Sequence, residues 1–173
     1  MTELPAGPSL EVVDGGTDAD ARSALAPLFE GASGFLGRLL AERPFGSWDA
    51  LFERGRAIAH AMPEVDQVEL IDAHPRLGAA PGAVSALSFR EQGYDRAERA
   101  PSATAEELET LNAAYESAFG FRYCVFVAGR SHDALIPELR AALGAERTAE
   151  LHRALDAVVD IALARHAALG ASR

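Results

Sequence analysis

Only one run in this sequence has the character of a β-strand, and this constrains the fold more than any other feature. Residues Phe121–Val127 are mostly apolar and rich in aromatic and β-branched side chains. A lone strand has no neighbour to take up its backbone hydrogen bonds, so this run cannot form a sheet. The sequence therefore predicts an extended buried segment here, or a poorly defined start to the next helix.

Helical signals cover most of the remaining chain. Ser47 is placed to cap a helix that runs to about Met62, and Pro63 suits the first turn of the next helix. That helix should end near His74, because the residue before Pro75 is disfavoured in the α region. The other predicted helices cover residues 21–30, 33–42, 88–98, 104–119, 131–143 and 147–169.

Length and composition are those of a single globular domain. The chain has 173 residues, of which 49% are hydrophobic and 24% charged, which is enough for one core. Residues 1–20 are rich in Gly, Pro, Asp and Thr without a sustained period, and predict a flexible N-terminal lead-in. Residues 21–170 are then expected to form an all-α fold, a single-domain bundle of about eight helices.

Charge and hydropathy exclude several classes of partner. The formal net charge of −10 argues against nucleic acid, because phosphate binding requires a basic surface. No apolar run approaches the ~20 residues that cross a bilayer. Residues 1–20 lack a signal-peptide pattern, and residues 171–173 differ from the usual peroxisomal signal. We therefore expect a cytoplasmic protein with neither nucleic-acid nor membrane partners.

The chain contains no lysine, since all 16 of its basic residues are arginine. This excludes Schiff-base chemistry on lysine, internal attachment of pyridoxal phosphate and the lysine of a phosphate-binding loop. The single cysteine, Cys124, cannot form an internal disulfide and lies in the apolar run, where a buried inert thiol is favoured over a nucleophile. Catalysis is left to His, Glu, Asp, Arg, Ser and Gln side chains and to the backbone.

One charged residue lies in the apolar stripe of the last predicted helix. Steps of four and three residues place six side chains on one face, and Arg165 is the only one that is not apolar. A guanidinium that faces a core must find an anion, since an unpaired buried charge is very costly. Arg165 is therefore in an internal ion pair, or exposed at a frayed helix end, or an anchor for a ligand in a pocket. The stripe consists of Leu151, Leu155, Val158, Ala162, Arg165 and Leu169.

His74 is the second candidate for a functional residue. It lies at a predicted helix end, on a backbone restricted by Pro75. The helix dipole favours the charged imidazole there, so His74 is expected to exchange a proton near neutral pH. A purely structural histidine remains the alternative.

Ser88 and Glu91 have the spacing of a capping box. In one interpretation, Glu91 therefore does no more than stabilise the start of a helix. A helix start also binds anions and carbonyl oxygens, and Ser88, Glu91 and Gln92 would supply three kinds of hydrogen-bonding group there. Both interpretations stay open. Residues 104–107 show the same pattern and predict the start of another helix.

Other catalytic and metal-binding patterns are incomplete. Residues 131–133, Ser-His-Asp, contain the residue types of a catalytic triad, but adjacent side chains point apart, so they are predicted to cap a helix. Asp72 and His74 could be two metal ligands, but no third or fourth ligand follows at a recognisable spacing. We therefore expect no metal site.

Several short motifs occur in a particular order along the chain. They are Arg43-Pro44-Phe45, His74-Pro75-Arg76-Leu77-Gly78, Ser88-x-x-Glu91-Gln92, Leu111-Asn112-x-x-Tyr115-Glu116-x-x-Phe119-Gly120-Phe121 and Ile161-x-x-x-Arg165. Each is weak alone, whereas the combination is highly specific. It resembles the decarboxylase family that acts on 2-oxo-4-hydroxy-4-carboxy-5-ureidoimidazoline (OHCU) in the last step from urate to (S)-allantoin. The likeness covers roughly residues 22–170.

The resemblance implies an all-helical, cofactor-free lyase that acts on a small molecule and forms a homodimer. It implies that His74 and Glu91 are the catalytic pair and that Arg165 is a third essential residue. It also implies that the ligand is contacted at Pro75, Ser88 and Gln92, and by backbone groups near Tyr123, Cys124 and Val125.

The chain departs from the family pattern after Phe-Gly-Phe. It has Arg122-Tyr123 where the family usually has Pro-Phe, and residues 124–130 are also atypical. This departure bears on the backbone contacts and not on His74, Glu91 and Arg165.

The resemblance suggests a mechanism. We hypothesise that His74, oriented by Glu91, moves the proton that controls loss of carbon dioxide and stereospecific reprotonation. Arg165, with Ser88 and Gln92, would fix the ring and stabilise developing charge. Two alternatives stay open: a non-catalytic helical interaction module on the same scaffold, and a metal hydrolase.

Overall fold

The computed structural model describes residues 7–95 and 102–170, and this part of the chain is helical without any strand. The all-α prediction is therefore confirmed. The described helices are α1 Leu10–Gly15, α2 Asp18–Leu25, α3 Ser33–Leu40, α4 Trp48–Ala61, α5 Glu64–Asp72, α6 Ala86–Glu91, α7 Ser102–Phe119, α8 His132–Ala142 and α9 Arg147–Gly170, with a single 3₁₀ turn at Pro81–Ala83.

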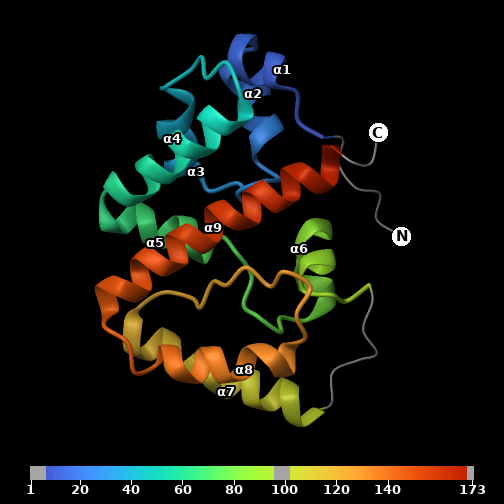
Figure 1. The fold of residues 1–173 in the computed structure, drawn as a ribbon, viewed down its shortest axis with the longest axis vertical. Helices are drawn as coiled ribbons and strands as arrows, with labels where there is room; N and C mark the ends of the chain where they lie inside the picture. The colour runs from blue at the N-terminus through green and yellow to red at the C-terminus, as the bar shows by residue number, and fades with distance from the viewer. Residues whose placement is uncertain (1–6, 96–101, 171–173) are drawn as a thin grey trace.

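Helix α9 runs through the middle of the molecule (Figure 1). It packs against α4 and α5 on one side, while α7 and α8 pack against each other on the other side. The predicted apolar stripe is confirmed, since all six of its side chains, including Arg165, are at most 4% exposed. Among the described helices none is both long and apolar enough to cross a membrane. The central position of α9 carries Arg165 into the core.

Several predicted helix boundaries are confirmed at the level of single hydrogen bonds. The Ser47 hydroxyl accepts from the amide of Ala50 at 3.1 Å, and Ser131 accepts from Ala134 at 3.2 Å. These are the N-cap contacts expected of serine. Helix α5 begins directly after Pro63, and its last residue, Asp72, lies two positions before His74.

Both predicted capping boxes are wrong. Helix α6 is capped by Ser85, whose hydroxyl accepts from the Ser88 amide at 3.2 Å. Ser88 therefore lies inside the helix, and Glu91 is its last residue rather than part of its start. Helix α7 already includes Ser102, so Thr104 is an interior residue, and its hydroxyl donates to Asp133 at 2.7 Å. The Ser/Thr-x-x-Glu spacing was present in both places, but an earlier residue began the helix.

In the described part of the N-terminal lead-in, residues 7–20, most positions are helical. Helix α1 covers residues 10–15, and Val13 is fully buried. The Arg43 side chain donates to the carbonyl oxygens of Val13 and Gly16, at 3.2 and 3.3 Å, which attaches this segment to the end of α3. A six-residue helix is too short to produce the sustained period that the sequence argument required. Residues 1–6 lie outside the described part.

The strand-like run forms the extended buried segment that was expected, with no regular structure over residues 121–127. Its carbonyl oxygens are bound by arginine side chains in place of a partner strand. Arg153 donates to Cys124 at 2.9 Å, and Arg130 donates to Phe126 at 2.7 Å and to Val127 at 3.0 Å. These contacts satisfy buried backbone acceptors that would otherwise be costly.

Candidate active site

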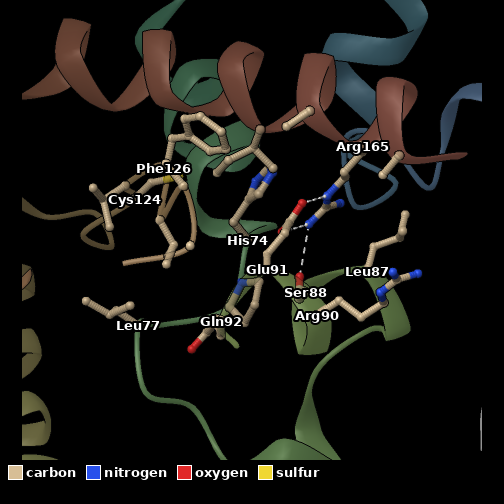
Figure 2. A pocket seen from close by; sticks show the side chains of 18 of the residues that line it. His74, Leu77, Leu87, Ser88, Arg90, Glu91, Gln92, Cys124, Phe126 and Arg165 are labelled. Atoms are coloured by element: carbon tan, nitrogen blue, oxygen red, sulfur yellow. Dashed lines mark hydrogen bonds and ion pairs between the residues drawn. The ribbon is translucent and has the colours of Figure 1, made fainter. Parts of the chain in front are cut away.

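A cavity of about 340 Å³ lies between α6, α9, the loop after α5 and the extended segment (Figure 2). Its lining includes apolar side chains such as Leu77, Leu87 and Phe126. All nine residues that the sequence singled out for a site lie on its wall, namely His74, Pro75, Ser88, Glu91, Gln92, Tyr123, Cys124, Val125 and Arg165. Residues from four distant parts of the chain therefore meet at one place.

His74 is held by the turn of helix that precedes it. Its Nδ1 lies 3.2 Å from the carbonyl oxygen of Leu70, so the neutral ring donates its proton there. The side chain is 3% exposed, and Nε2 has no hydrogen-bond partner within the described residues. A buried ring nitrogen without a partner is unusual in proteins. Because Nδ1 carries the proton, Nε2 holds a lone pair that no described group uses.

The expected protonation of His74 near neutral pH is wrong. Burial, with a further contribution from the charge of Arg165, lowers the pKa of His74 to about 4, and the charge of Glu30 and the bond to Leu70 oppose this only in part. Desolvation of the imidazolium outweighs the helix dipole, because the dipole effect is typically only about 0.3–1 kcal/mol whereas burial can shift a pKa by several units. His74 is a neutral hydrogen-bond acceptor at neutral pH.

Arg165 makes a bidentate ion pair with Glu91. Nε donates to Oε1 at 2.6 Å and Nη2 donates to Oε2 at 2.8 Å, while Nη1 donates to the carbonyl oxygen of Pro27 at 2.7 Å. The Arg165 side chain is 1% exposed. The ion-pair interpretation of Arg165 is therefore confirmed, and Arg165 also lines the cavity, whereas its role as a ligand anchor stays a prediction.

Glu91 does not orient His74 by a hydrogen bond. In the described part of the chain both of its carboxylate oxygens accept from Arg165, and no bond to His74 is present. Burial raises the pKa of Glu91, and the charge of Glu30 adds to this, whereas the bonds to Arg165 oppose it. The group that fixes the His74 ring is the carbonyl of Leu70.

Glu30 is a member of this cluster that sequence reasoning missed. Its Oε1 accepts from Arg165 Nη2 at 2.8 Å, from the Ser88 hydroxyl at 2.5 Å and from the Ser85 hydroxyl at 2.8 Å. Burial would raise the pKa of Glu30, but the charge of Arg165 and these hydrogen bonds lower it. A local signal was available only in the glycine at position 31, which marks a turn and not a functional side chain.

Gln92 holds the loop that carries His74. Its Oε1 accepts from the amide of Gly78 at 2.8 Å and from the hydroxyl of Tyr94 at 3.0 Å, and its Nε2 donates to the carbonyl of Arg76 at 3.0 Å. Gly78 has φ +79°, a conformation that favours glycine. Contact of Gln92 with a ligand stays a prediction, whereas its contact with this loop is direct.

The extended segment forms the opposite wall. The carbonyl of Cys124 is bound by Arg153, but the amide groups of Tyr123, Cys124 and Val125 donate to no group in the part of the chain that the structure describes. Unpaired backbone donors beside a cavity are available to a ligand. Cys124 is buried, which raises the pKa of its thiol to about 12, so it is inert as expected.

Arg122, which departs from the family pattern, fastens the extended segment to the end of α5. Its backbone amide donates to the Asp72 carboxylate at 2.8 Å, and its guanidinium donates to the carbonyls of Asp72 and His74 at 2.7 and 3.0 Å. The Asp72 carboxylate is thus bound to the backbone of Arg122. Among the described residues no group of three or more His, Cys, Asp or Glu side chains could hold a metal ion.

Comparison with known proteins gives a consistent family. A family model described as OHCU decarboxylase matches residues 16–167. The chain is 30% identical over 128 residues to the 2-oxo-4-hydroxy-4-carboxy-5-ureidoimidazoline decarboxylase of Halalkalicoccus jeotgali, covering 74% of this chain and 72% of that protein. It is 34% identical over 138 residues to the uric acid degradation bifunctional protein PucL of Bacillus subtilis, covering 80% of this chain. The match spans only 28% of PucL.

The fold has also been seen before. A crystal structure of OHCU decarboxylase in the presence of (S)-allantoin superposes with a TM-score of 0.70 at 23% identity, covering 90% of this chain and 99% of the other. A crystal structure of (S)-allantoin synthase gives a TM-score of 0.65 at 19% identity, covering 93% of this chain and 54% of the other. At these identities the likeness supports the fold.

Proposed function

This chain belongs to the OHCU decarboxylase family, and from that membership we propose that it is a carboxy-lyase that converts OHCU to (S)-allantoin and carbon dioxide in urate degradation. The observation that carries the proposal is the meeting of His74, Glu91 and Arg165 at one cavity, although they lie far apart in the sequence. Two similar proteins that are named for uric acid degradation also support a role in this pathway.

The substrate supplies the electron sink that this chain lacks. When the carboxylate leaves as carbon dioxide, its bonding electron pair stays on the ring and delocalises into the adjacent C=N bond. One proton is then taken up in place of the carbon dioxide. A protein without lysine and without a bound cofactor can support this step, because its task is to position the ring and move protons.

His74 acts on the substrate hydroxyl in this proposal. Its Nδ1 proton is committed to Leu70, so Nε2 can only accept a proton at the start of the reaction. The hydroxyl on the carbon that bears the carboxylate is a suitable donor. The imidazolium that forms is a strong acid, because the pKa of His74 is about 4, and it readily returns a proton to the ring. General acid–base catalysis of this kind typically contributes ~10²–10⁴-fold.

The remaining wall positions hold the ring. We propose that Pro75, Ser88 and Gln92 contact the ligand, and that the amides of Tyr123, Cys124 and Val125 bind its oxygen atoms. Arg165 acts by fixing Glu91 and Ser88, since its Nε and Nη2 donate to protein groups. Backbone donors fixed beside developing negative charge stabilise it without reorganisation.

We also propose that the protein acts without a metal or cofactor, as a cytoplasmic homodimer. Activity that survives a chelator and exhaustive dialysis supports the first statement and excludes a metal hydrolase. Light scattering of the purified protein checks the dimer, for which a mass of twice 18.3 kDa is expected.

The central test is turnover of freshly generated OHCU by the purified chain. We expect rapid appearance of optically active allantoin, measured by circular dichroism. In His74→Ala, turnover should be lost, because the variant lacks the Nε2 atom that accepts the substrate proton. The far-ultraviolet spectrum of the helices should be retained. Only the slow racemic background with the wild-type protein would favour a non-catalytic interaction module. Near-normal turnover in His74→Ala would remove His74 from the mechanism.

A further inference from the structure

Glu30 reaches the site from the loop between α2 and α3, outside all the motifs that mark the family. Its carboxylate is 15% exposed and bonds both the guanidinium of Arg165 and the hydroxyl of Ser88. A carboxylate with these partners could be only a structural counter-ion. The directions of the hydrogen bonds indicate that it also orients Ser88 and Arg165.

The bond to Glu30 fixes the direction of the Ser88 hydroxyl. An ionised carboxylate can only accept, so the Ser88 proton points to Glu30, at an oxygen–oxygen distance of 2.5 Å. Arg165 Nη2 donates to the same hydroxyl oxygen at 3.0 Å. The Ser88 side chain is 1% exposed and lines the cavity. Towards a ligand, Ser88 can therefore only accept.

Glu30 also keeps Arg165 on the protein side of the cavity. The Nη2 group donates to Glu30, Ser88 and Glu91, and Nε donates to Glu91. Figure 2 shows Arg165, Glu91 and Ser88 turned towards one another beside His74. On this part of the wall Ser88 and Glu91 therefore offer acceptors to a ligand, whereas the free amides of the extended segment offer donors.

The backbone of Glu30 supports a specific placement of this side chain. Its φ is +49°, in the left-handed region that non-glycine residues rarely adopt, and Gly31 follows with φ +72°. Such a conformation persists only where the surrounding structure holds it, and it concentrates at functional sites. The three bonds accepted by the Glu30 carboxylate are the contacts that hold it.

We infer that Glu30 is a positioning residue of the decarboxylase site, which turns the Ser88 hydroxyl and the Arg165 guanidinium away from the ligand, so that Ser88 and Glu91 present only hydrogen-bond acceptors to it. The inference rests on the proposed function and deepens it. The N–H groups of the substrate face Ser88 and Glu91, its hydroxyl faces His74, and its carboxylate faces the amides of residues 123–125.

A double-mutant cycle tests this inference. Glu30→Gln removes the charge at nearly constant shape, and Ser88→Ala removes the hydroxyl that Glu30 directs. Each single variant is expected to lower kcat/KM by roughly ten- to a hundred-fold, because small misplacements at a site are costly. The double variant should lose little more than the worse single variant, since the two residues act as a unit. Glu69→Gln is the matched control, because its carboxylate also binds a serine hydroxyl, that of Ser33, but lies away from the cavity.

The pH profile separates positioning from a general structural effect. The charged groups around His74 include Arg165 from α9, Glu30 from the loop before α3 and Arg122 from the extended segment, and the charge of Glu30 raises the pKa of His74. Glu30→Gln should therefore move the acid limb of kcat/KM to lower pH. Loosening that admits water would move it up, towards 6.5.

Each outcome decides between the claims. Additive losses in the cycle, or an acid limb that moves up, would overturn the inference about Glu30 and leave the decarboxylase assignment intact. Lack of turnover by the wild-type chain would overturn both. The same cycle measured by urea unfolding reports whether the Glu30–Ser88 contact exists, independently of activity.

Discussion

Two effects act on the pKa of His74 in opposite directions: the helix dipole raises it and burial lowers it. The sequence placed this residue correctly at the end of a helix, where the dipole favours a charged ring. It could not show that the ring would be 3% exposed and close to a buried arginine. Burial depends on contacts with residues nearly a hundred positions away, so the sequence predicted the location of His74 but not its pKa.

The lowered pKa of His74 has a consequence for stability. Between about pH 6.5 and 4 the unfolded chain binds a proton at this residue and the folded chain does not, so the free energy of unfolding should fall as the pH is lowered through this window. Across this window the free energy of unfolding should fall by about 3 kcal/mol in total. Below pH 4 His74 should cause no further change. Urea unfolding at a series of pH values measures it.

The matched variant for that measurement is His74→Gln, which cannot titrate. Its free energy of unfolding should vary less with pH across the same window than that of the wild-type protein. Equal slopes in the two proteins would show that His74 is not buried as a neutral ring.

Among the elements, those with local signals were predicted best. Helix starts at Ser47 and Ser131 were found because the cap and the amide that it binds lie three residues apart. The same logic failed at Ser88, since Ser85 competes for the cap and a spacing alone does not reveal backbone conformation. For residues 121–127 the sequence predicted an extended segment but not its partners, because Arg153 comes from α9 and the turn that brings Arg130 back onto the segment has no distinctive spacing.

The extended segment should depend on these arginines for its shape. In Arg153→Met the stem still packs beside Tyr123, but the bond to the Cys124 carbonyl is lost. We expect kcat/KM to fall by roughly ten-fold or more, because the adjacent amides shift relative to the ligand. Steady-state kinetics at a temperature where the variant is fully folded measure this effect.

Arg140→Met provides the comparison, because Arg140 is an exposed arginine whose ion pair with Glu107 lies on the surface. It should retain nearly full activity. Equal activity in Arg153→Met and Arg140→Met would mean that the Cys124 carbonyl contact does not shape the site.

At the scale of the whole molecule, α9 brings the separate parts of the site together. The buried stripe on the last helix was readable from the sequence, and so was the presence of one charge in it. Local patterns singled out five of the nine wall positions one by one, but that all nine belong to one site came from resemblance to a family, since no local pattern connects residue 74 with residue 165. Glu30 was missed for the same reason, because its partners lie 55 to 135 positions further along the chain.

A cavity built from so many segments should stabilise the whole fold when it is filled. We expect (S)-allantoin to raise the melting temperature of the wild-type protein, measured by differential scanning fluorimetry. At a concentration of about 100 times Kd the stabilisation should be about 2.7 kcal/mol. For a chain of this size that corresponds to roughly 5–10 °C.

Ser88→Ala should reduce that increase, since Ser88 lies on the cavity wall. Thr110→Ala, at an exposed position on α7, should leave it unchanged. A product-induced increase of the same size in both variants would place the ligand elsewhere on the protein.

The wall formed by residues 123–125 presents main-chain atoms, and this affects how the protein can vary. Every amino acid except proline carries the same amide group, so exchanging the side chains of these residues need not alter what the ligand meets. The selective constraint moves instead to the distant residue that fixes the path of the chain, Arg153. Homologues should therefore tolerate drift along the wall itself while retaining some equivalent side-chain donor behind it.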